Sequence, residues 1–255
     1  MVQVRPYYAE QSLSAAYYDL LTSLDRSLDG DIELYASLAP AGGRILEVGT
    51  GTGRIAFALA EKGFEVVGVD LAPTMLRQAR ARQAAADPQV AGRMSFVQGD
   101  MTALSVEGPF AAAIFPFFTL AHAPRGSAWR NVFSGLAARL APGALAAFHM
   151  PAEASLDQPP PKGPKEPVLS VRVDGGRTLQ LFIRERRRRP DIGRYDQVLD
   201  YVLLDARGRE ERRSAERLTY YSGDPTPFAE ESGLEPDRTP VPLGASGEVF
   251  VFRKL

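Results

Sequence analysis

The chain has 255 residues, of which 45% are hydrophobic and 24% charged, as is ordinary for a globular protein. Its net charge of −1 excludes a general attraction for nucleic acid, and its lack of cysteine excludes disulfides, thiolate metal sites and cysteine nucleophiles. The sequence contains no run of eighteen apolar residues, so no membrane span is expected. Residues 1–8 lack the apolar core of a secretory signal. We therefore expect a cytoplasmic protein with one large α/β domain, or a domain that carries an insertion.

Residues 1–39 are expected to form an N-terminal helical lid. Apolar residues recur at helical spacing between residues 7 and 39, until the sequence Pro40-Ala-Gly-Gly43 ends the pattern. Beyond it, short apolar runs alternate with helical stretches, which is typical of a doubly wound sheet.

The alternating region is expected to form the core, in residues 40–155 and 222–255. Strands are expected at 44–48, 65–69, 94–97, 110–115, 144–149 and 248–253, and helices at 53–62, 73–86, 126–140 and 226–232. This order predicts an α/β fold with a Rossmann-like, doubly wound, seven-stranded sheet.

Residues 156–221 are expected to form a linker and a roof inserted into this core. Five prolines between 157 and 167 cannot donate backbone hydrogen bonds, which predicts a linker. Strand-like runs follow at 168–173, 178–188, 194–204 and 211–221, separated by glycine-containing turns. They predict an antiparallel β meander, whose exposed edge could pair with another copy as a homodimer.

A glycine-rich turn, Glu47-Val-Gly-Thr-Gly-Thr-Gly53, follows the first expected strand. Glycine lets a ligand approach the backbone closely because no Cβ intervenes. Dinucleotide-binding enzymes carry G-x-G-x-x-G at this place and bind a pyrophosphate there. Here the spacing is G-x-G-x-G, and the Glu47 carboxylate would repel a pyrophosphate. The same carboxylate suits an ammonium and a sulfonium, so the loop favours S-adenosylmethionine over NAD.

Carboxylates also follow the next two expected strands. Asp70 ends the second strand, where a carboxylate can accept hydrogen bonds from both ribose hydroxyls. Asp100 and Met101 follow the third strand, where they can bind the adenine amine and cover the ring. Ligands of open α/β sheets bind at the carboxyl ends of the strands, so the three motifs together predict one cofactor site.

These motifs, at residues 46–54, 68–75 and 96–101, resemble the successive cofactor motifs of class I S-adenosylmethionine-dependent methyltransferases over roughly residues 40–150. The resemblance implies an enzyme that uses this cofactor and no metal. It implies that the 47–53 loop contacts the methionine part, Asp70 the ribose and Leu71 the adenine, while Phe115–Phe117 line the transfer site. The cofactor-binding residues expected in this way are Tyr17, Glu47, Gly49, Thr50, Gly51, Gly53, Asp70, Leu71, Met75, Asp100, Met101, Phe115 and Phe117.

Several classes of methyl acceptor lack the residues that they need. Cytosine-C5 chemistry needs a cysteine nucleophile, and the chain has none. Adenine-N6 enzymes carry an Asn/Asp-Pro-Pro motif where this sequence reads Phe115-Pro-Phe-Phe118. Metal-dependent catechol chemistry needs an acidic cluster that residues 141–149 do not offer. The leading hypothesis is transfer to an N or O atom of a small molecule.

His122 lies beyond the fourth expected strand and is a candidate general base, with capping of the next helix as the alternative. Residues 118–122 are similar to those of small-molecule N-methyltransferases that act on glycine or on amino sugars. Tyr17, Tyr18 and Asp19 match the N-terminal region of the amino-sugar group. This resemblance implies that Tyr18 helps to close the acceptor site and that Tyr17 contacts the cofactor, while ordinary helix packing is the alternative for both.

Two other functions stay open. The basic run Arg184–Arg189 would suit an RNA methyltransferase, although a solvated hairpin end is the simpler interpretation. No nucleic-acid or membrane partner is therefore expected. A protein that binds S-adenosylmethionine without catalysis is the second alternative.

Overall fold

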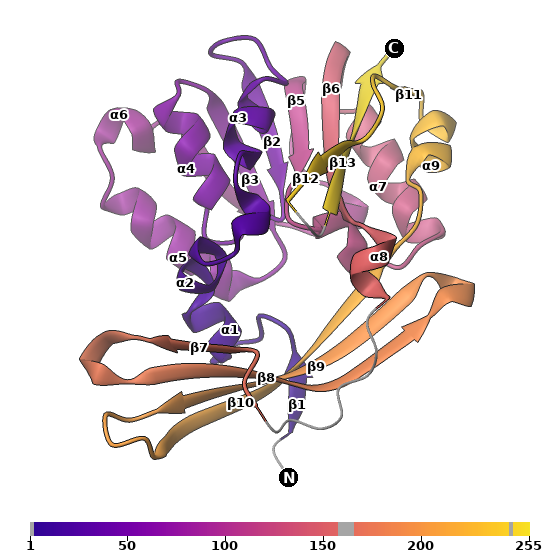
Figure 1. The fold of residues 1–255 in the computed structure, drawn as a ribbon. Helices are drawn as coiled ribbons and strands as arrows, with labels where there is room; N and C mark the ends of the chain where they lie inside the picture. The colour runs from indigo at the N-terminus through magenta and orange to yellow at the C-terminus, as the bar shows by residue number, and fades with distance from the viewer. Residues whose placement is uncertain (1–2, 158–165, 245–246) are drawn as a thin grey trace.

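The chain folds into an α/β core and a separate five-stranded sheet, the roof, which lies across the bottom of Figure 1. The structure is a computed structural model and describes residues 3–157, 166–244 and 247–255. Most of the expected linker, residues 158–165, lies outside the described residues. No helix in the described part of the chain is long and apolar enough to cross a membrane.

The core sheet has eight strands, one more than the expected seven. Seven lie in the order β11-β13-β6-β5-β2-β3-β4, and β12 pairs with β13 beside this row. The strands are β2 (Arg44–Val48), β3 (Glu65–Asp70), β4 (Met94–Gln98), β5 (Phe110–Phe115), β6 (Leu140–Pro151), β11 (Leu234–Pro236), β12 (Val241–Leu243) and β13 (Gly247–Lys254). Because β2 to β6 are mutually parallel, their carboxyl ends meet at one edge of the sheet, which faces the roof.

Helices cover both faces of the core sheet, so its strands are apolar on both sides. In β2, Leu46 and Val48 pack on one face, with Trp129 and Phe133 of α7, whereas Ile45 packs on the other face. Helices α3 (Asp31–Ala36), α4 (Arg54–Glu61), α5 (Pro73–Ala84) and α6 (Pro88–Ala91) lie on one side of the sheet, and α7 (Ser127–Ala137) and α9 (Thr226–Glu231) on the other (Figure 1).

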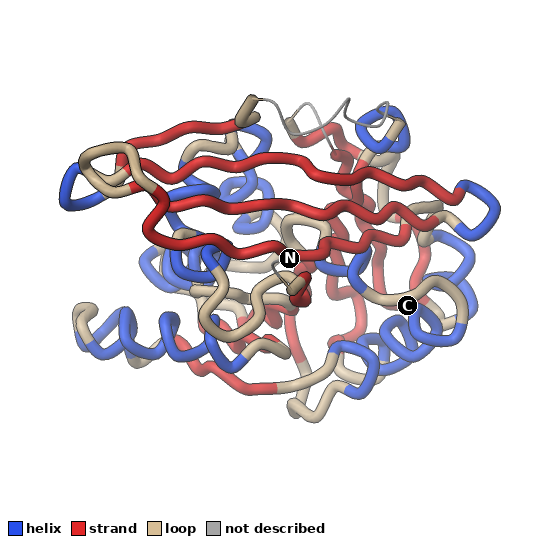
Figure 2. The backbone as a smooth tube through the Cα atoms, turned by 90° about the horizontal axis from the view of Figure 1, so that it is seen from below, coloured by secondary structure: helices blue, strands red, loops and turns tan. Residues whose placement is uncertain are grey.

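The roof contains the four expected antiparallel strands, with bounds close to those predicted. They are β7 (Leu169–Arg172), β8 (Thr178–Arg189), β9 (Arg194–Leu204) and β10 (Glu210–Tyr221), seen from below in Figure 2. Along β9, Leu199, Tyr201 and Leu203 alternate on the inner face, where they form an apolar cluster with Leu13. A fifth strand, β1 (Val4–Pro6), pairs in parallel with β10 and was not expected from the sequence.

The N-terminal segment is less regular than the helical lid that was expected. After β1 come α1 (Leu13–Ala16), α2 (Tyr18–Ser23), a 3-10 turn at Arg26–Leu28, and α3. The segment contacts both sheets. The amide of Leu13 donates to Ser214 Oγ of the roof at 3.1 Å, and Thr52 Oγ1 of the core donates to Asp19 Oδ1 at 2.5 Å. The segment therefore holds the roof and the core together.

Candidate functional site

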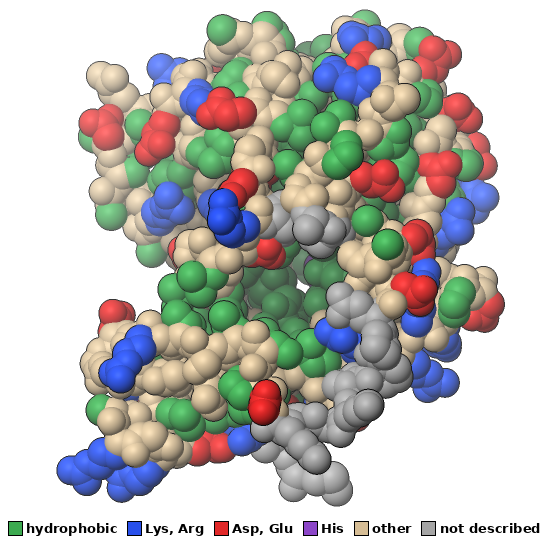
Figure 3. Space-filling model, viewed as in Figure 1, with side chains coloured by type: hydrophobic (Ala, Val, Ile, Leu, Met, Phe, Trp, Pro, Cys, Tyr) green, Lys and Arg blue, Asp and Glu red, His purple; other side chains and the backbone are tan. Residues whose placement is uncertain are grey.

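A cavity of about 340 Å³ lies at the carboxyl ends of β2, β3 and β5, between the core and the N-terminal segment. Figure 3 shows a hollow between the core and the roof whose visible walls are mostly hydrophobic. The lining residues are Tyr7, Tyr8, Tyr18, Glu47, Val48, Gly49, Thr50, Gly51, Arg54, Ile55, Val69, Asp70, Leu71, Ala72, Met75, Gly99, Asp100, Met101, Pro116, Phe117, Thr119 and His122. The three predicted cofactor motifs therefore meet in one place.

The glycine loop turns sharply from β2 into α4. Gly49 and Gly51 have φ angles of 75° and 57°, which L side chains rarely adopt. The Gly49 amide donates to the Val69 carbonyl at 2.7 Å, which ties the loop to β3. A Cβ at Gly49 would lie 2.3 Å from Thr119 Oγ1, so this position also lacks room for a side chain.

Glu47 is buried at the bottom of the loop, and its side chain is 1% exposed. Its Oε2 accepts a hydrogen bond from Thr50 Oγ1 at 2.7 Å. Burial raises the pKa of Glu47 to about 8, and the Thr50 hydroxyl and the more distant Arg54 charge lower it only in part. No cation in the described part of the chain pairs with this carboxyl group, so a cationic ligand would stabilise its charged form.

Asp70 holds the turn that follows β3. Its two carboxylate oxygens accept the backbone amides of Gly51 and Ala72, each at 2.8 Å. Burial raises the pKa of Asp70 against the effect of these hydrogen bonds. Each oxygen keeps a lone pair that can accept a ligand hydroxyl. The Asp70 carboxylate is thus positioned by the backbone before any ligand arrives.

The outer end of the cavity is more open. The Asp100 carboxylate accepts the amide and the hydroxyl of Thr102, both at 2.8 Å, and is exposed at the mouth. Leu71 is 67% exposed, which is unusual for a large apolar side chain. With the partly buried Met101, Leu71 offers an apolar surface to a flat ligand.

Three predicted cofactor residues do not line the cavity. Tyr17 packs with the inner face of the roof, because the chain turns between α1 and α2. Gly53 is the N-cap of α4 and has a φ of 82°, and a Cβ there would lie 3.0 Å from the Phe96 ring and 3.2 Å from the Phe57 ring. Phe115 is fully buried and stacks on Phe148 with 4.4 Å between ring centroids, so it belongs to the core. The other ten predicted cofactor residues all line the cavity.

Both candidate catalytic residues, Tyr18 and His122, line the cavity. The His122 ring lies 5.1 Å from the Tyr220 ring and is exposed to the cleft, yet enough protein surrounds it that desolvation lowers its pKa to about 4. His122 is therefore neutral at pH 7 and able to accept a proton. The capping alternative is wrong, because α7 begins after Gly126 without a side-chain cap.

Among the polar and aromatic residues that line the cavity, four were not among the predicted site residues: Tyr7, Tyr8, Arg54 and Thr119. Arg54 forms a two-pronged ion pair with the buried carboxylate of Asp31. Its position directly after Gly53, the last glycine of the loop, was the sequence feature that could have indicated a place in the cavity. The Tyr7 and Tyr8 rings lie 4.2 Å apart, and the Tyr8 ring lies 5.4 Å from the Tyr18 ring. Only the clustering of tyrosines pointed to them.

The glycine loop and the carboxylates that line the cavity lie in a segment that matches a known protein family. Residues 45–143 match the family model described as "Methyltransferase domain". This segment is similar to that family of domains. Within it lie most of β2, all of β3 to β5, the glycine loop and the carboxylates of Glu47 and Asp70.

Curated relatives and solved structures extend this likeness. Demethylmenaquinone methyltransferase of Thermus thermophilus is 36% identical over 158 residues, which cover 58% of this chain and 64% of that protein. The chain spans less than two thirds of the length of the curated relatives it matches, and only 29% of one from Bacillus subtilis.

Solved structures share the whole fold at low sequence identity. The CcbJ methyltransferase of Streptomyces caelestis is 22% identical, with a TM-score of 0.73 and 98% of both chains covered. CalS10, an amino pentose methyltransferase from Micromonospora echinaspora solved with S-adenosylmethionine, is 19% identical, with a TM-score of 0.71 and coverage of 97% and 99%. The roof and the N-terminal segment are thus part of the shared fold, beyond residues 45–143.

Proposed function

We propose that this protein transfers the methyl group of S-adenosylmethionine to a nitrogen or oxygen atom of a small molecule. The observation that carries the proposal is the convergence of two carboxylates, the buried Glu47 and the partly buried Asp70, on either side of the glycine loop in one cavity. Glu47 lacks a cation, which the methionine ammonium would supply. Asp70 has free lone pairs for the two ribose hydroxyls. Leu71, Asp100 and Met101 are proposed to hold the adenine.

The residues beyond the cofactor are proposed to align the acceptor. The cofactor supplies an activated methyl group, so the protein needs to position a nucleophile in line with the methyl–sulfur bond. As that bond breaks and the new bond to the acceptor forms, the acceptor proton must leave. The neutral His122 is proposed to accept it directly or through water. Tyr18 is proposed to hold the accepting atom in place.

An amine nitrogen is favoured as the accepting atom. Tyr8, Tyr18 and Phe117 line the cavity with aromatic rings, and aromatic faces stabilise the positive charge that a neutral amine acquires as its lone pair takes the methyl group. One neighbour of the same fold is an amino pentose methyltransferase and another a sugar N-methyltransferase. The alternative of RNA is not proposed, because Arg184 and Arg188 of the basic run already pair with Asp200 and Glu153.

The domain division predicted from the sequence is also part of this proposal. We infer that residues 156–221 are an insertion into the cofactor-binding core, since β7 to β10 form a sheet of their own between β6 and α9. A homodimer through the open β7 edge stays a prediction, which light scattering of the purified protein would test.

Asp70→Ala tests the cofactor assignment. Loss of two hydrogen bonds from ribose to a charged acceptor should weaken binding of S-adenosylmethionine and S-adenosylhomocysteine by about 100-fold. Calorimetric titration measures both affinities, with NAD as the negative control. Asp87→Ala is the matched variant, because Asp87 also caps backbone amides but begins α6, outside the cavity. Unchanged affinity in Asp70→Ala, or binding of NAD by the natural protein, would refute the assignment.

A further inference from the structure

A second hollow lies beside the first, where the roof meets the core. It is lined by Val4, Arg5, Pro6, Tyr7, His122, Arg217 and Thr219. It exists because β1 pairs only with residues 215–217 of β10, which leaves the edge of β10 uncovered beyond that point, next to the turn that carries His122. Tyr7 and His122 line both hollows. The second hollow therefore gives the proposed transfer site a side entrance.

Two arginines without carboxylate partners line this entrance. Arg5 and Arg217 are both exposed, and no carboxylate in the described ranges lies within 4.0 Å of either guanidinium. Arg5 makes one long hydrogen bond, 3.5 Å, to the carbonyl of Glu10. The charge of Arg217 lowers the pKa of Asp196 without forming an ion pair, so the hydrogen-bond donors of both guanidinium groups remain available to a ligand.

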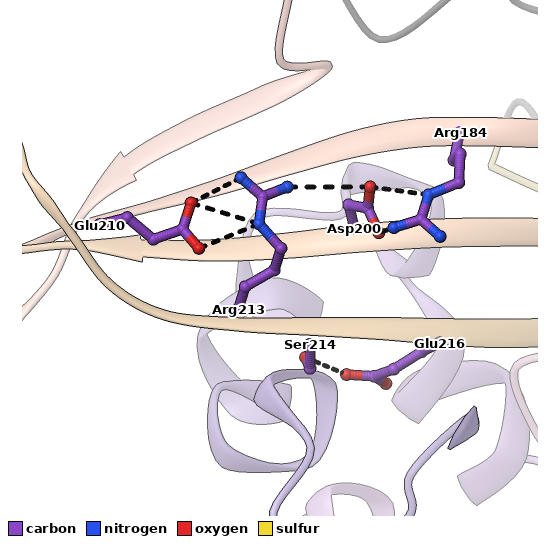
Figure 4. Close-up of polar contacts among 6 residues, drawn as sticks. All are labelled: Arg184, Asp200, Glu210, Arg213, Ser214 and Glu216. Carbon is purple, nitrogen blue, oxygen red and sulfur yellow. Dashed lines mark hydrogen bonds and ion pairs between the residues drawn. The ribbon is translucent and has the colours of Figure 1, made fainter. Parts of the chain in front are cut away.

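Three arginines of the roof, Arg184, Arg194 and Arg213, form ion pairs, whereas Arg187 and Arg189 form none within the described residues. Arg184 and Arg213 both pair with the buried Asp200, at 2.6 and 3.8 Å, and Arg213 also pairs with Glu210 at 2.6 Å (Figure 4). Arg194 pairs with Asp196 at 2.8 Å. These guanidiniums are fixed by the roof.

Two carboxylates that neighbour Arg217 already make other hydrogen bonds, Asp196 in a hollow that Arg217 also lines and Glu216 beside it in the chain. Asp196 accepts hydrogen bonds from both Arg194 and Thr219. Glu216 is fully buried on the inner face and accepts a hydrogen bond from Ser214 at 2.6 Å (Figure 4). Neither can neutralise the entrance without giving up these contacts, so a ligand is the available source of negative charge.

We propose that Arg5 and Arg217 bind an oxyanion group, a phosphate or a carboxylate, on the methyl acceptor. Guanidinium groups bind oxyanions through paired, charge-assisted hydrogen bonds. The nucleophilic end of an acceptor held there would extend past Tyr7 and His122 into the first cavity. The cofactor would occupy the other end of that cavity, near Leu71 and Asp100. This inference rests on the proposed function, because it places the acceptor of that same reaction.

Binding of simple anions tests the subsite without knowledge of the acceptor. The full chain, saturated with S-adenosylhomocysteine, is titrated calorimetrically with inorganic phosphate, pyrophosphate and succinate. We expect binding that weakens with salt and falls at least 10-fold in Arg217→Gln and in Arg5→Gln. Arg207→Gln, an exposed arginine in the turn between β9 and β10, is the control and should bind like the natural protein.

The outcomes separate the two proposals. Preference for the phosphates over succinate identifies a phosphorylated acceptor, and the reverse identifies a carboxylated one. If S-adenosylhomocysteine binds but no anion does, or if Arg217→Gln and Arg207→Gln bind anions equally well, the subsite is refuted while the proposed function stands. If S-adenosylhomocysteine itself fails to bind, the proposed function fails. The melting temperature and the S-adenosylhomocysteine affinity of each variant show that its fold is intact.

Discussion

Glu47 is a carboxyl group held in a place where it cannot easily ionise. Burial without a cation raises its pKa to about 8, so most of the free protein carries a protonated Glu47 at pH 7. A ligand ammonium at this side chain would favour the carboxylate and lower its pKa. Cofactor binding and proton loss from Glu47 are therefore expected to occur together.

Binding of S-adenosylhomocysteine at pH 7 should release close to one proton. The heat of binding, measured by calorimetry in phosphate and in Tris, should differ because these buffers take up the proton with different enthalpies. Glu47→Gln should bind about 10- to 100-fold more weakly, since it loses a charge-assisted interaction, and should release no proton. Equal heats in the two buffers for the natural protein would contradict this account.

At the same scale, the residues that could be predicted are those whose position follows from the backbone. Glu47, Asp70 and Asp100 follow strand ends, and a parallel sheet brings such positions together. Tyr17 and Phe115 were expected at the cofactor but lie outside the cavity, because a pattern of residue types does not fix which way a side chain points. Arg54 was missed because its partner Asp31 is distant in the sequence.

Among the elements, the N-terminal segment depends most on its contacts. Helix α1 has four residues, too few to be stable alone. Its first amides, of Leu13 and Ser14, donate to Ser214 and Glu216 of the roof at 3.1 and 3.3 Å. The roof thus acts as the cap of this helix and holds the lid above the cavity.

Ser214→Ala should loosen the N-terminal segment and leave the core unchanged. Loss of the buried hydrogen bond should cost about 1 kcal/mol and raise amide exchange in residues 4–23 several-fold, as measured by hydrogen–deuterium exchange with mass spectrometry. Ser170→Ala, at an exposed position of β7, is the matched control. Exchange that rises equally throughout the chain, or not at all in residues 4–23, would show that Ser214 does not hold the lid.

The length of an element explains whether the sequence could predict it. The strands β8 and β9 are strand-like runs of eleven or more residues next to glycine-containing turns, and β2 is a clear apolar run before the glycine loop, so their positions were confirmed. The strands β1, β11 and β12 have three residues each, which is too short for a pattern. They form because a neighbouring strand edge is available, and that is decided by the tertiary fold.

For the whole molecule, buried titratable groups make stability depend on pH in two opposite ways. Folding raises the pKa of Glu47 from 4.5 to about 8, so between these values the folded protein holds a proton that the unfolded chain has lost, and rising pH favours unfolding. Folding lowers the pKa of the buried His149 from 6.5 to about 4, so in that window falling pH favours unfolding. Above pH 6.5 the opposing effects of His149 and of His122, whose pKa is also lowered to about 4, fade, and the effect of Glu47 dominates.

The cofactor-free protein should therefore lose stability between pH 6.5 and 8. One retained proton changes the free energy of unfolding by about 1.4 kcal/mol per pH unit. Because Glu47 is half ionised near pH 8 and the two imidazoles oppose it near pH 6.5, the fall over this range is roughly 1 kcal/mol. Urea unfolding at the two pH values measures it. Glu47→Gln should remove the fall, whereas Glu61→Gln, an exposed carboxylate at the end of α4, should keep it. Saturating S-adenosylhomocysteine should largely remove the fall, because Glu47 is then ionised in both the complex and the unfolded chain. The same fall in Glu47→Gln would mean that another group carries the pH dependence.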